Sequence, residues 1–393
     1  MRNYYFILLP LLLSCINNEN FKYSNSLYDV NAAVMGKIDK NGKTEFYSFG
    51  PSRQNDEQAI NENSIFRIAS MTKAIGCVAA LQLVDKGLIS LDEPLDKFLP
   101  EMTDIKILNE KNILIEPKVK ITLRHLLTHT AGFGYWFTSP KIYNWDEMKK
   151  DLDYKNKYPP RLFESGSSFM YGTNIDWVGR LVEEITKTNL EDYFRENITG
   201  PLKMNSTWFN LPEELDSLVV TYYERDSDGK LVEVEYVKRK KTNSFNAGGG
   251  LLSSPKDYSK FLLCMLNKGK YDGGSLISEE IFNELNSPQL KDFKQKHLYV
   301  ENANVDVKPR GDRDYFFDGN DNWTLGWAYE ENSLIRPKGT AYWAGFYNTY
   351  FTIDFENNFA IVYMSQILPF NDDKSYNLFT SFERYVYENL KIK

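Results

Sequence analysis

Hydrophobic and polar positions give both ends of the chain a strand-like pattern. Val30–Ile38 and Thr44–Phe49 are two such segments, and the Asn41-Gly42 dipeptide between them is a strong hairpin signal. Towards the other end, strand-like segments return and are followed by an amphipathic helical pattern over Lys374–Leu390. These later strand segments are Leu325–Tyr329, Ala341–Ile353 and Phe359–Ser365. The pattern therefore predicts that the two ends of the chain build one sheet.

Between these ends the pattern is mostly helical, from Ser70 to roughly Leu290, with Gly, Pro and Asn as interruptions. No internal repeat and no low-complexity segment divides the chain. We therefore predict an α+β fold that forms one catalytic unit over residues 27–393. A mostly helical insertion, roughly residues 90–290, is expected to lie between the strands of the two ends.

The first residues are predicted to be a targeting segment. Arg2 precedes Tyr4–Leu13, an apolar run whose ten residues would reach about 15 Å as a helix, roughly half of a bilayer core. That length is typical of a signal-peptide core and too short for a spanning helix. The run ends in Leu-Leu-Ser-Cys at Cys15, which resembles the lipobox of bacterial lipoproteins.

We therefore expect residues 1–14 to be a lipoprotein-type signal peptide and Cys15 to be lipid-modified. Residues 15–26 are polar and would form a flexible tether. The chain would then be exported to the bacterial cell envelope and held at a membrane by its lipid. The alternative is an ordinary secretory signal that happens to contain a Cys.

Composition narrows the function classes. Hydrophobic residues make up 42% of the chain and aromatic residues 15%, which is typical of a globular protein. The net charge of −7, without a basic stripe, argues against nucleic acid as a partner. Three Cys cannot build a disulfide framework, and three His without a Cys/His cluster do not predict a metal site. We expect no metal and no cofactor.

The strongest chemical signal is Ser70 followed by Lys73. Between Met71 and Val84 the helical pattern is apolar on almost every side, which predicts a helix buried inside the domain. Lys73 is its only charged residue, and a buried ammonium is costly unless it has a function or a partner. Three residues apart, Ser70 and Lys73 share one face of the first turn. A desolvated Lys beside a Ser indicates a nucleophile and its base.

The structural alternative is that Ser70 caps the helix and Lys73 extends to solvent. Ser-x-x-Lys is a weak motif alone, and it recurs at Ser227–Lys230 and Ser253–Lys256. The first of these lies in a Gly-containing turn, and the second, with Pro255, is typical of a capped helix start. Neither leads into a helix that is apolar on all sides, so the context favours Ser70. No G-x-S-x-G elbow occurs, which excludes the α/β-hydrolase alternative.

Five ordered segments carry a resemblance to a known family. They are Ser70–Lys73 (SMTK), Ile121–Gly134 (ITLRHLLTHTAGFG), Leu162–Arg180 (LFESGSSFMYGTNIDWVGR), Asn246–Leu263 (NAGGGLLSSPKDYSKFLL) and Tyr342–Asp354 (YWAGFYNTYFTID). The chain resembles serine hydrolases of the class C β-lactamase and penicillin-binding protein superfamily. Its branch is most similar to the family VIII carboxylesterases. The resemblance implies a β-lactamase/transpeptidase-like antiparallel sheet flanked by helices.

The resemblance also implies a second catalytic group, a Tyr that passes protons between the nucleophile and the leaving group, and Tyr171 matches it. The alternative for Tyr171 is a buried aromatic residue with a satisfied hydroxyl. Family members often carry Asn two residues after this Tyr. Here that position is Thr173 and the Asn follows as Asn174, so Asn174 is only a candidate for substrate binding.

A third family motif, Lys-Thr-Gly or His-x-Gly, is replaced by Trp343-Ala344-Gly345. Losing the Lys removes the cation that anchors a substrate carboxylate, and a Trp face favours a neutral acyl or aromatic group. We therefore expect Trp343 and Gly345 to contact substrate. By the resemblance, the backbone N–H groups of Ser70 and Phe346 would form the oxyanion hole.

The leading hypothesis is a serine hydrolase that cleaves small-molecule carboxylic esters, or amides, through a Ser70 acyl-enzyme. Lys73 and Tyr171 would carry the protons, and water or an alcohol would release the acyl group. Two alternatives stay open. One keeps the chemistry and changes the substrate, as in a β-lactamase or a peptidoglycan DD-peptidase. The other is a non-catalytic surface lipoprotein that uses the fold for binding.

Overall fold

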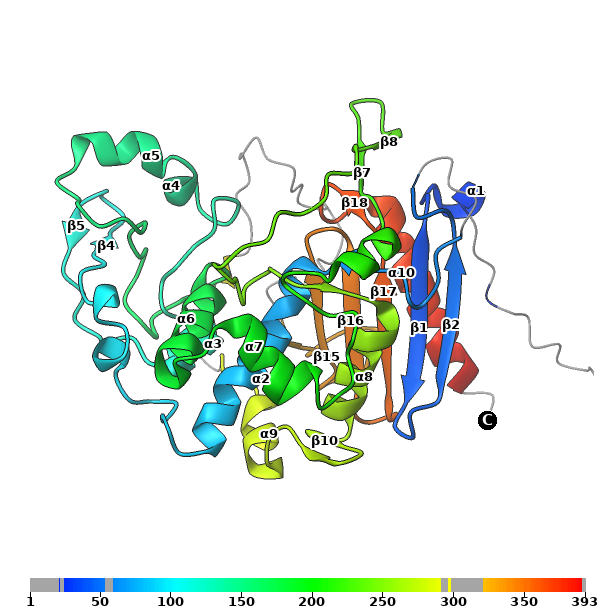
Figure 1. Cartoon of the computed structure of the whole chain (residues 1–393). Coiled ribbons are helices and arrows are strands. Elements are labelled where there is room, and N and C mark those ends of the chain that lie inside the picture. The colour runs from blue at the N-terminus through cyan, green and yellow to red at the C-terminus, as the bar shows by residue number, and fades with distance from the viewer. Residues whose placement is uncertain (1–20, 22–24, 54–58, 291–295, 298–320, 391–393) are drawn as a thin grey trace, which may run out of the picture.

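A seven-stranded antiparallel sheet forms the centre of the computed structural model, which describes residues 21, 25–53, 59–290, 296–297 and 321–390. Its strand order is β13-β14-β15-β16-β17-β1-β2, and Figure 1 labels the strands from β15 to β2. The bounds are β1 Ala33–Asp39, β2 Thr44–Phe49, β13 Asn322–Trp323, β14 Ala328–Tyr329, β15 Ala341–Gly345, β16 Thr349–Asp354 and β17 Phe359–Met364.

The two ends of the chain meet in this sheet. β1 pairs with β17, with Gly36 opposite Val362, so the N-terminal hairpin joins the C-terminal strands. Gly42 takes a φ of 85° in the turn between β1 and β2, as the hairpin signal predicts. The predicted α+β class, with an antiparallel sheet flanked by helices, is confirmed.

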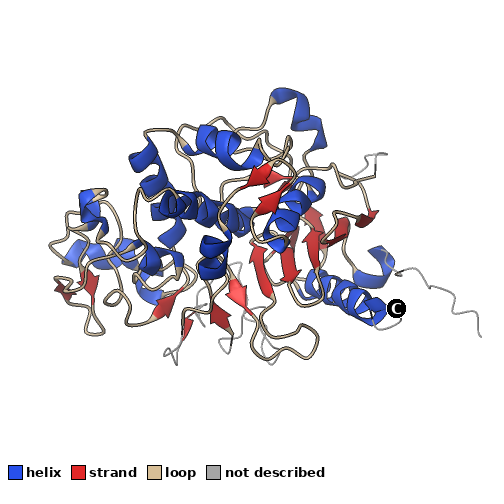
Figure 2. Cartoon of the chain, turned by 90° about the horizontal axis from the view of Figure 1, so that it is seen from below, coloured by secondary structure: helices blue, strands red, loops and turns tan. Residues whose placement is uncertain are grey.

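Helices cover both faces of the sheet because its side chains alternate with a period of two (Figure 2). Tyr350 stacks on Phe379 of α10 (Asp373–Leu390), with ring centroids 4.7 Å apart. The next residue, Phe351, points the other way and contacts Tyr258 of α8 (Pro255–Leu266) at 5.8 Å. The β16 strand therefore separates an α10 layer from a layer that contains α8.

Most of the remaining helices and short strands lie between β2 and β13, while α1 precedes β1 and β18 follows β17. The other α-helices are α1 Asn25–Tyr28, α2 Thr72–Asp85, α3 Leu123–Leu127, α4 Pro140–Tyr143, α5 Trp145–Met148, α6 Asn174–Thr186, α7 Leu190–Phe194 and α9 Glu279–Leu285. The short strands are β3 Phe66–Arg67, β4 Ile107–Leu108, β5 Leu114–Ile115, β6 Phe169–Met170, β7 Tyr223–Arg225, β8 Leu231–Glu233, β9 Leu252–Ser253, β10 Lys270–Tyr271, β11 Gly274–Ser275, β12 Lys296–His297 and β18 Ile367–Leu368. Short 3-10 or π helices are η1 Ala69–Met71, η2 Leu95–Lys97, η3 Pro100–Met102, η4 Lys149–Asp151, η5 Arg195–Thr199 and η6 Glu213–Leu218.

One predicted strand is wrong. Ala341–Ile353 is not continuous, because the chain reverses after Gly345 and returns as β16. Asn348 makes the reversal with a left-handed φ of 58°, a conformation that Asn tolerates better than most residues. Its side chain donates to the carbonyl groups of Ile367 and Pro369, both at 2.8 Å, which holds the turn. The three residues between Gly345 and Thr349 include no Gly or Pro, and the turn was not predicted.

Candidate active site

The candidate nucleophile lies on a tight turn at the start of a buried helix. η1 carries Ser70 and leads directly into α2, whose residues from Thr72 to Leu83 are all buried, as predicted. Ala69 precedes Ser70 with a φ of 41°, which is rare for a residue with a side chain and costs about 1–3 kcal/mol. This strained turn leaves Ser70 partly accessible to solvent.

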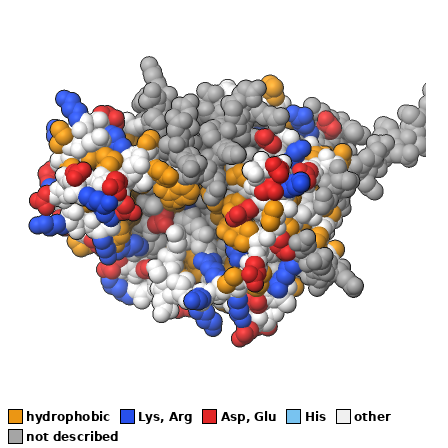
Figure 3. Space-filling view, turned by 90° about the horizontal axis from the view of Figure 1, so that it is seen from above, with side chains coloured by type: hydrophobic (Ala, Val, Ile, Leu, Met, Phe, Trp, Pro, Cys, Tyr) orange, Lys and Arg blue, Asp and Glu red, His pale blue; other side chains and the backbone are white. Residues whose placement is uncertain are grey.

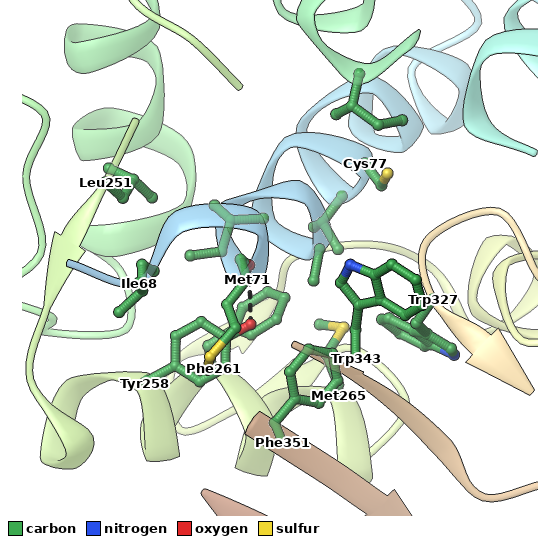
Figure 4. Packing of buried hydrophobic residues seen from close by; sticks show 14 of the residues in the cluster. Ile68, Met71, Cys77, Leu251, Tyr258, Phe261, Met265, Trp327, Trp343 and Phe351 are labelled. Atoms are coloured by element: carbon green, nitrogen blue, oxygen red, sulfur yellow. Dashed lines mark hydrogen bonds between the residues drawn. The ribbon is translucent and has the colours of Figure 1, made fainter. Parts of the chain in front are cut away.

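The layer between α2 and the sheet fixes this turn (Figure 4). The Tyr258 hydroxyl donates to the Met71 carbonyl at 2.9 Å, and the Met71 side chain is fully buried beside it. On the other side, the Leu251 N–H donates to the Thr72 hydroxyl at 3.2 Å. The nucleophile turn is therefore held by side-chain bonds as well as by its own helix.

Lys73 lies beside Ser70 and is 1% exposed. Its Nζ is 3.2 Å from Ser70 Oγ and 3.0 Å from the Tyr135 hydroxyl, and it also donates to the Gly248 carbonyl. An ammonium has three N–H donors, and these three oxygens use all of them. A neutral amine would keep two donors for Tyr135 and Gly248 and could accept the Ser70 proton with its lone pair.

Tyr135 is a member of this site that the sequence reasoning missed. Its hydroxyl accepts from Lys73 and donates to Asp176 Oδ2 at 3.4 Å, so it links the two charged groups. Burial and the nearby carboxyl of Asp176 raise the pKa of Tyr135 well above its ordinary value. The phenol therefore stays protonated and acts as a hydrogen-bond donor.

Asp176 completes the cluster from the first turn of α6. Burial raises the pKa of its carboxyl, while the charge of Lys73 and bonds from Asn246 and Tyr135 oppose that rise. The carboxyl lies so close to the Gly248 segment that a Cβ at Gly248 would meet its Oδ2 at 2.4 Å. A side chain at Gly248 would therefore displace the Asp176 carboxyl from its present position.

Tyr171 faces the same amine from another side. The Lys73 Nζ lies 4.8 Å from the Tyr171 ring centroid, and the Tyr171 hydroxyl accepts a hydrogen bond from Trp343 Nε1 at 3.2 Å. The two tyrosine rings lie 5.5 Å apart. The predicted residues Ser70, Lys73, Tyr171 and Trp343 thus come together, while the direct hydroxyl bond to Lys73 is made by Tyr135.

Asn174 lies behind Tyr171, on the side of the His129 ring. It is completely buried, and its Nδ2 lies 3.0 Å from His129 Nδ1 and 3.3 Å from the Phe133 carbonyl. The His129 ring packs against Tyr171, with centroids 4.8 Å apart. Asn174 therefore contacts His129, on which the Tyr171 ring packs, and within the described residues it makes no hydrogen bond to Ser70 or Lys73.

The end of β15 closes the site beside the nucleophile turn. A Cβ at Gly345 would meet the Ile68 carbonyl oxygen at 2.2 Å, so only glycine permits this approach. Ile68 is two residues before Ser70, and Phe346 directly follows Gly345. This contact brings the two predicted oxyanion-hole residues into neighbouring segments.

Aromatic side chains line the rim. Phe137 stacks on Tyr135 at 4.9 Å and lies 6.2 Å from Phe346, which in turn stacks on Phe370 at 6.4 Å. Trp136, which lies between Tyr135 and Phe137 in the sequence, is 41% exposed. Seen from above, hydrophobic side chains gather around the central hollow of this face, with charged side chains to either side (Figure 3). The rim is suited to apolar groups.

Within the described residues, no group of three or more His, Cys, Asp and Glu side chains could hold a metal ion. The arrangement can support acyl transfer, because a hydroxyl, an amine and two phenols meet under an aromatic rim. The missed residues lie in or directly beside segments that the sequence already singled out. Tyr135 directly follows Ile121–Gly134, and Asp176 lies within Leu162–Arg180.

Comparisons with known proteins identify the family of the chain. A family model described as Beta-lactamase matches residues 28–382. Monacolin J acid methylbutanoyltransferase of Aspergillus terreus is 28% identical over 347 residues, which cover 82% of this chain and 81% of that protein. Acyltransferase mokF of Monascus pilosus is 33% identical over 259 residues, and this match spans 62% of this chain and 61% of that relative's length. The structure of unliganded simvastatin synthase (LovD) from Aspergillus terreus is similar with a TM-score of 0.80 at 26% identity, covering 94% of this chain and 96% of that one.

Proposed function

The chain belongs to the beta-lactamase family and is an enzyme of the serine hydrolase or acyl-transferase type, and on that premise we propose that it cleaves carboxylic esters through a Ser70 acyl-enzyme. Membership of the superfamily was predicted from the sequence and is confirmed. The observation that carries the proposal is the buried Lys73 amine 3.2 Å from Ser70 Oγ. Trp343, which donates a hydrogen bond to Tyr171, stands where other family members have the Lys that binds a substrate carboxylate.

The proposed reaction begins at the Ser70 hydroxyl. Its proton moves to the neutral Lys73 amine as Oγ attacks the ester carbonyl carbon, and the carbonyl oxygen becomes an oxyanion. The N–H groups of Ser70 and Phe346 stabilise that oxyanion. Tyr171 then donates a proton to the departing alkoxide and is reprotonated from Lys73, which leaves the acyl group on Ser70 as an ester.

The acyl group is released by water or by an alcohol. Two relatives carry acyltransferase names, one of them for a methylbutanoyl group, which supports transfer to an alcohol as well as hydrolysis. In both cases the incoming hydroxyl gives its proton to the Lys73 and Tyr171 pair while its oxygen attacks the acyl carbon.

The surroundings support a neutral, apolar acyl group. Trp343 is bonded to Tyr171 and presents no cation, and the rim from Tyr135 to Phe370 is aromatic. A β-lactam or a peptidoglycan stem peptide carries a carboxylate that the family's Lys-Thr-Gly motif would bind. The absence of that Lys disfavours the β-lactamase and DD-peptidase alternatives.

The test is the ratio of kcat/KM for 4-nitrophenyl butyrate to kcat/KM for nitrocefin, with Ser70→Ala as the blank. We expect a ratio well above one and no measurable ester turnover in the blank. A ratio well below one would mean that the chain is a β-lactamase. Ester turnover retained by Ser70→Ala would exclude the acyl-enzyme, and the absence of fluorophosphonate labelling at Ser70 would favour the binding-protein alternative.

We also propose export and lipid attachment at Cys15, which lies outside the described residues. The support is the lipobox-like sequence that ends at Cys15. Within the described residues, no helix has the length and apolar character to cross a bilayer. Metabolic labelling with a palmitate analogue tests the proposal: incorporation lost in Cys15→Ala supports it, and equal incorporation in both proteins contradicts it.

A further inference from the structure

A hollow in the helical part of the molecule contains a buried arginine that the proposed reaction does not use. The hollow has a volume of about 280 Å³ and lies between the η2–η3 segment and the chain after β5. Arg161, which is 1% exposed, lines it. The backbone of Arg161 bonds to Lys106 and Leu108, so this residue lies beside β4. In Figure 1, β4 and β5 are at one side of the molecule and α10 is at the other.

The Arg161 guanidinium has more donors than acceptors. Its Nη1 donates to the Ser165 hydroxyl at 2.7 Å and to the Ala131 carbonyl at 3.3 Å. Its Nε is buried without a hydrogen-bond partner, and within the described residues Arg161 forms no ion pair. A buried guanidinium N–H that has lost its water and gained no acceptor is costly. Arg161 therefore has a donor left for a ligand.

A second buried donor lies within electrostatic reach of Arg161. The Tyr154 hydroxyl is buried and has no hydrogen-bond partner within the described residues. Burial raises the pKa of Tyr154 to about 12, against the opposing charge of Arg161, so the hydroxyl keeps its proton. Tyr154 lines a neighbouring hollow, and Glu116 lines both hollows. Two buried donors without an acceptor indicate a place for a ligand oxygen.

The carboxylates around the hollow already have other partners. Asp96 lies 2.6 Å from Lys120. Glu116 lies 2.8 Å from Lys106. The Glu164 carboxylate accepts two backbone N–H groups of the chain after β5, at 2.9 and 3.1 Å. Burial lowers the pKa of the guanidinium to about 10, and the charge of Glu164 opposes that shift only in part. One buried positive charge is therefore left without a paired carboxylate.

The rest of the lining is mostly apolar. Leu95, Met102 and Ile121 are buried, and Val119 is 43% exposed. The volume of the hollow is close to the lower end of the range for small-molecule sites, about 300 Å³. A single cation beside an apolar wall suits a small molecule with one anionic end and a short apolar body.

We propose that this hollow binds a small amphipathic carboxylate. The carboxylate oxygens accept hydrogen bonds from Arg161 and Tyr154, and the apolar part contacts Leu95, Met102 and Ile121. A carboxylate is favoured because its two oxygens match the planar edge of a guanidinium. The site does not depend on the proposed ester cleavage, and none of the residues that line it takes part in that reaction.

Calorimetry with octanoate and octanamide tests the site, because the two molecules have the same chain and differ in charge. We expect Kd for octanoate to be about tenfold lower than Kd for octanamide, since only the carboxylate pairs with the buried guanidinium. Equal Kd values, or no detectable binding of octanoate, would mean that water serves the two buried donors and would overturn the proposal.

Two variants assign the preference for the anion to this hollow. Arg161→Gln should bring the ratio of the two Kd values close to one. Tyr154→Phe should reduce the ratio about threefold, and it should keep the stability of the wild type because the hydroxyl has no partner within the described residues. Tyr143→Phe and Arg384→Gln, at an exposed tyrosine of α4 and an exposed arginine of α10, are matched controls that should leave the ratio unchanged. A wild-type ratio in Tyr154→Phe would overturn the proposal even if Arg161→Gln does not fold.

The location of the bound carboxylate is tested separately, because a small acid can also enter the active site. Octanoate should slow amide hydrogen exchange in residues 117–121, which line the hollow, and Lys73→Met should keep the wild-type ratio of Kd values. Protection confined to the segments around Ser70 would place the carboxylate in the active site and overturn the proposal. A ratio that is lost in Lys73→Met and kept in Arg161→Gln would overturn it in the same way.

Discussion

Two buried charge clusters lie on opposite sides of β15. Trp343 pairs with Phe351 and Tyr342 with Thr352, so these neighbours point to opposite faces of the sheet. On the Trp343 side is the nucleophile cluster, formed by Ser70, Lys73, Tyr135 and Asp176. On the Tyr342 side is the arginine cluster, formed by Arg336, Glu330 and Glu383.

The two clusters differ in the charge of the groups that surround their cations. The hydrogen-bond partners of Lys73 are two hydroxyls and a carbonyl, and its carboxylate, Asp176, is reached only through Tyr135. Arg336 instead lies 3.5 Å from Glu330 and 3.6 Å from Glu383, with its guanidinium 4.4 Å from the Tyr342 ring centroid. Burial lowers the pKa of Arg336, but Glu383, Tyr342 and Glu330 raise it more, so the net shift is upward.

Because of this difference, the charge of Lys73 can change during a reaction, whereas the charge of Arg336 is fixed. An amine surrounded by neutral acceptors can lose and regain a proton during a reaction. A guanidinium between two carboxylates stays charged, and its removal leaves two acidic groups uncompensated in the interior. Substitutions in the nucleophile cluster should therefore change activity, and substitutions in the arginine cluster should change stability.

Lys73→Met should give the largest effect. Methionine fills a similar volume but cannot accept the Ser70 proton, so we expect kcat for 4-nitrophenyl butyrate to fall by about 10³–10⁴-fold. Lys73 has no direct ion pair within the described residues, and an apolar side chain avoids the cost of burying an ammonium, so the midpoint of unfolding in guanidinium chloride should not fall. More than a tenth of the wild-type kcat in this variant would show that Lys73 is not the base.

Arg336→Met applies the same kind of substitution to the other cluster and should have the opposite outcome. Glu330 and Glu383 lose their cation, so the free energy of unfolding should fall by about 3–5 kcal/mol. Denaturant unfolding measures that loss, and kcat per folded enzyme should stay within twofold of wild type, because Arg336 does not reach Ser70. A fall in kcat at unchanged stability would contradict the proposed division of roles.

Parts of the nucleophile cluster were predictable because they are local. Ser70 and Lys73 are three residues apart on one helix, and the apolar pattern around them predicts burial without knowledge of the rest of the chain. That β1 and β17 belong to one sheet was predictable for a related reason, since strand-like segments occur at both ends and must share a core.

Tyr135 and Asp176 were not predictable in this way. Tyr135 is 62 residues from Lys73 and is one of 26 tyrosines, and nothing in its local pattern says which one reaches the amine. The family resemblance led to Tyr171, whose hydroxyl bonds to Trp343 in the structure. The missing information is the relative placement of loops, which depends on packing between distant segments, as at Gly248 against Asp176.

A pair of matched substitutions distinguishes the two tyrosines. Tyr135→Phe keeps the ring but breaks the link between Lys73 and Asp176, so we expect kcat to fall about tenfold and the pH profile to shift. Tyr171→Phe should cost about 10²-fold if its hydroxyl carries the leaving-group proton. Steady-state kinetics from pH 5 to 9 measure both effects. The reverse order of the two losses would make Tyr135 the proton carrier.

The smallest expected effect is a change in how stability depends on pH, measured through Glu330→Gln. Burial raises the pKa of Glu330 to about 7, from an ordinary value of 4.5. Between these two values the folded state holds a proton that the unfolded state has released, so this group makes the free energy of unfolding fall as pH rises from about 4.5 to 7. Glutamine cannot titrate but can still accept the bonds that the Asn332 and Ser333 N–H groups make to the Glu330 carboxyl.

We would measure the free energy of unfolding in guanidinium chloride at several pH values. Above pH 4.5 it should depend less on pH in Glu330→Gln than in the wild type. Glu279 is a control whose pKa is shifted in the opposite direction. Lys270 and Lys268 lower the pKa of Glu279 to about 2 at the protein surface. Its contribution to stability is complete above pH 4.5 and is lost only as pH falls towards 2, so Glu279→Gln should leave the slope above pH 4.5 unchanged. If Glu330→Gln runs parallel to wild type over this window, Glu330 is ionised throughout it. The arginine cluster would then be a permanently charged triad, and its contrast with the proton-exchanging nucleophile cluster would be even sharper.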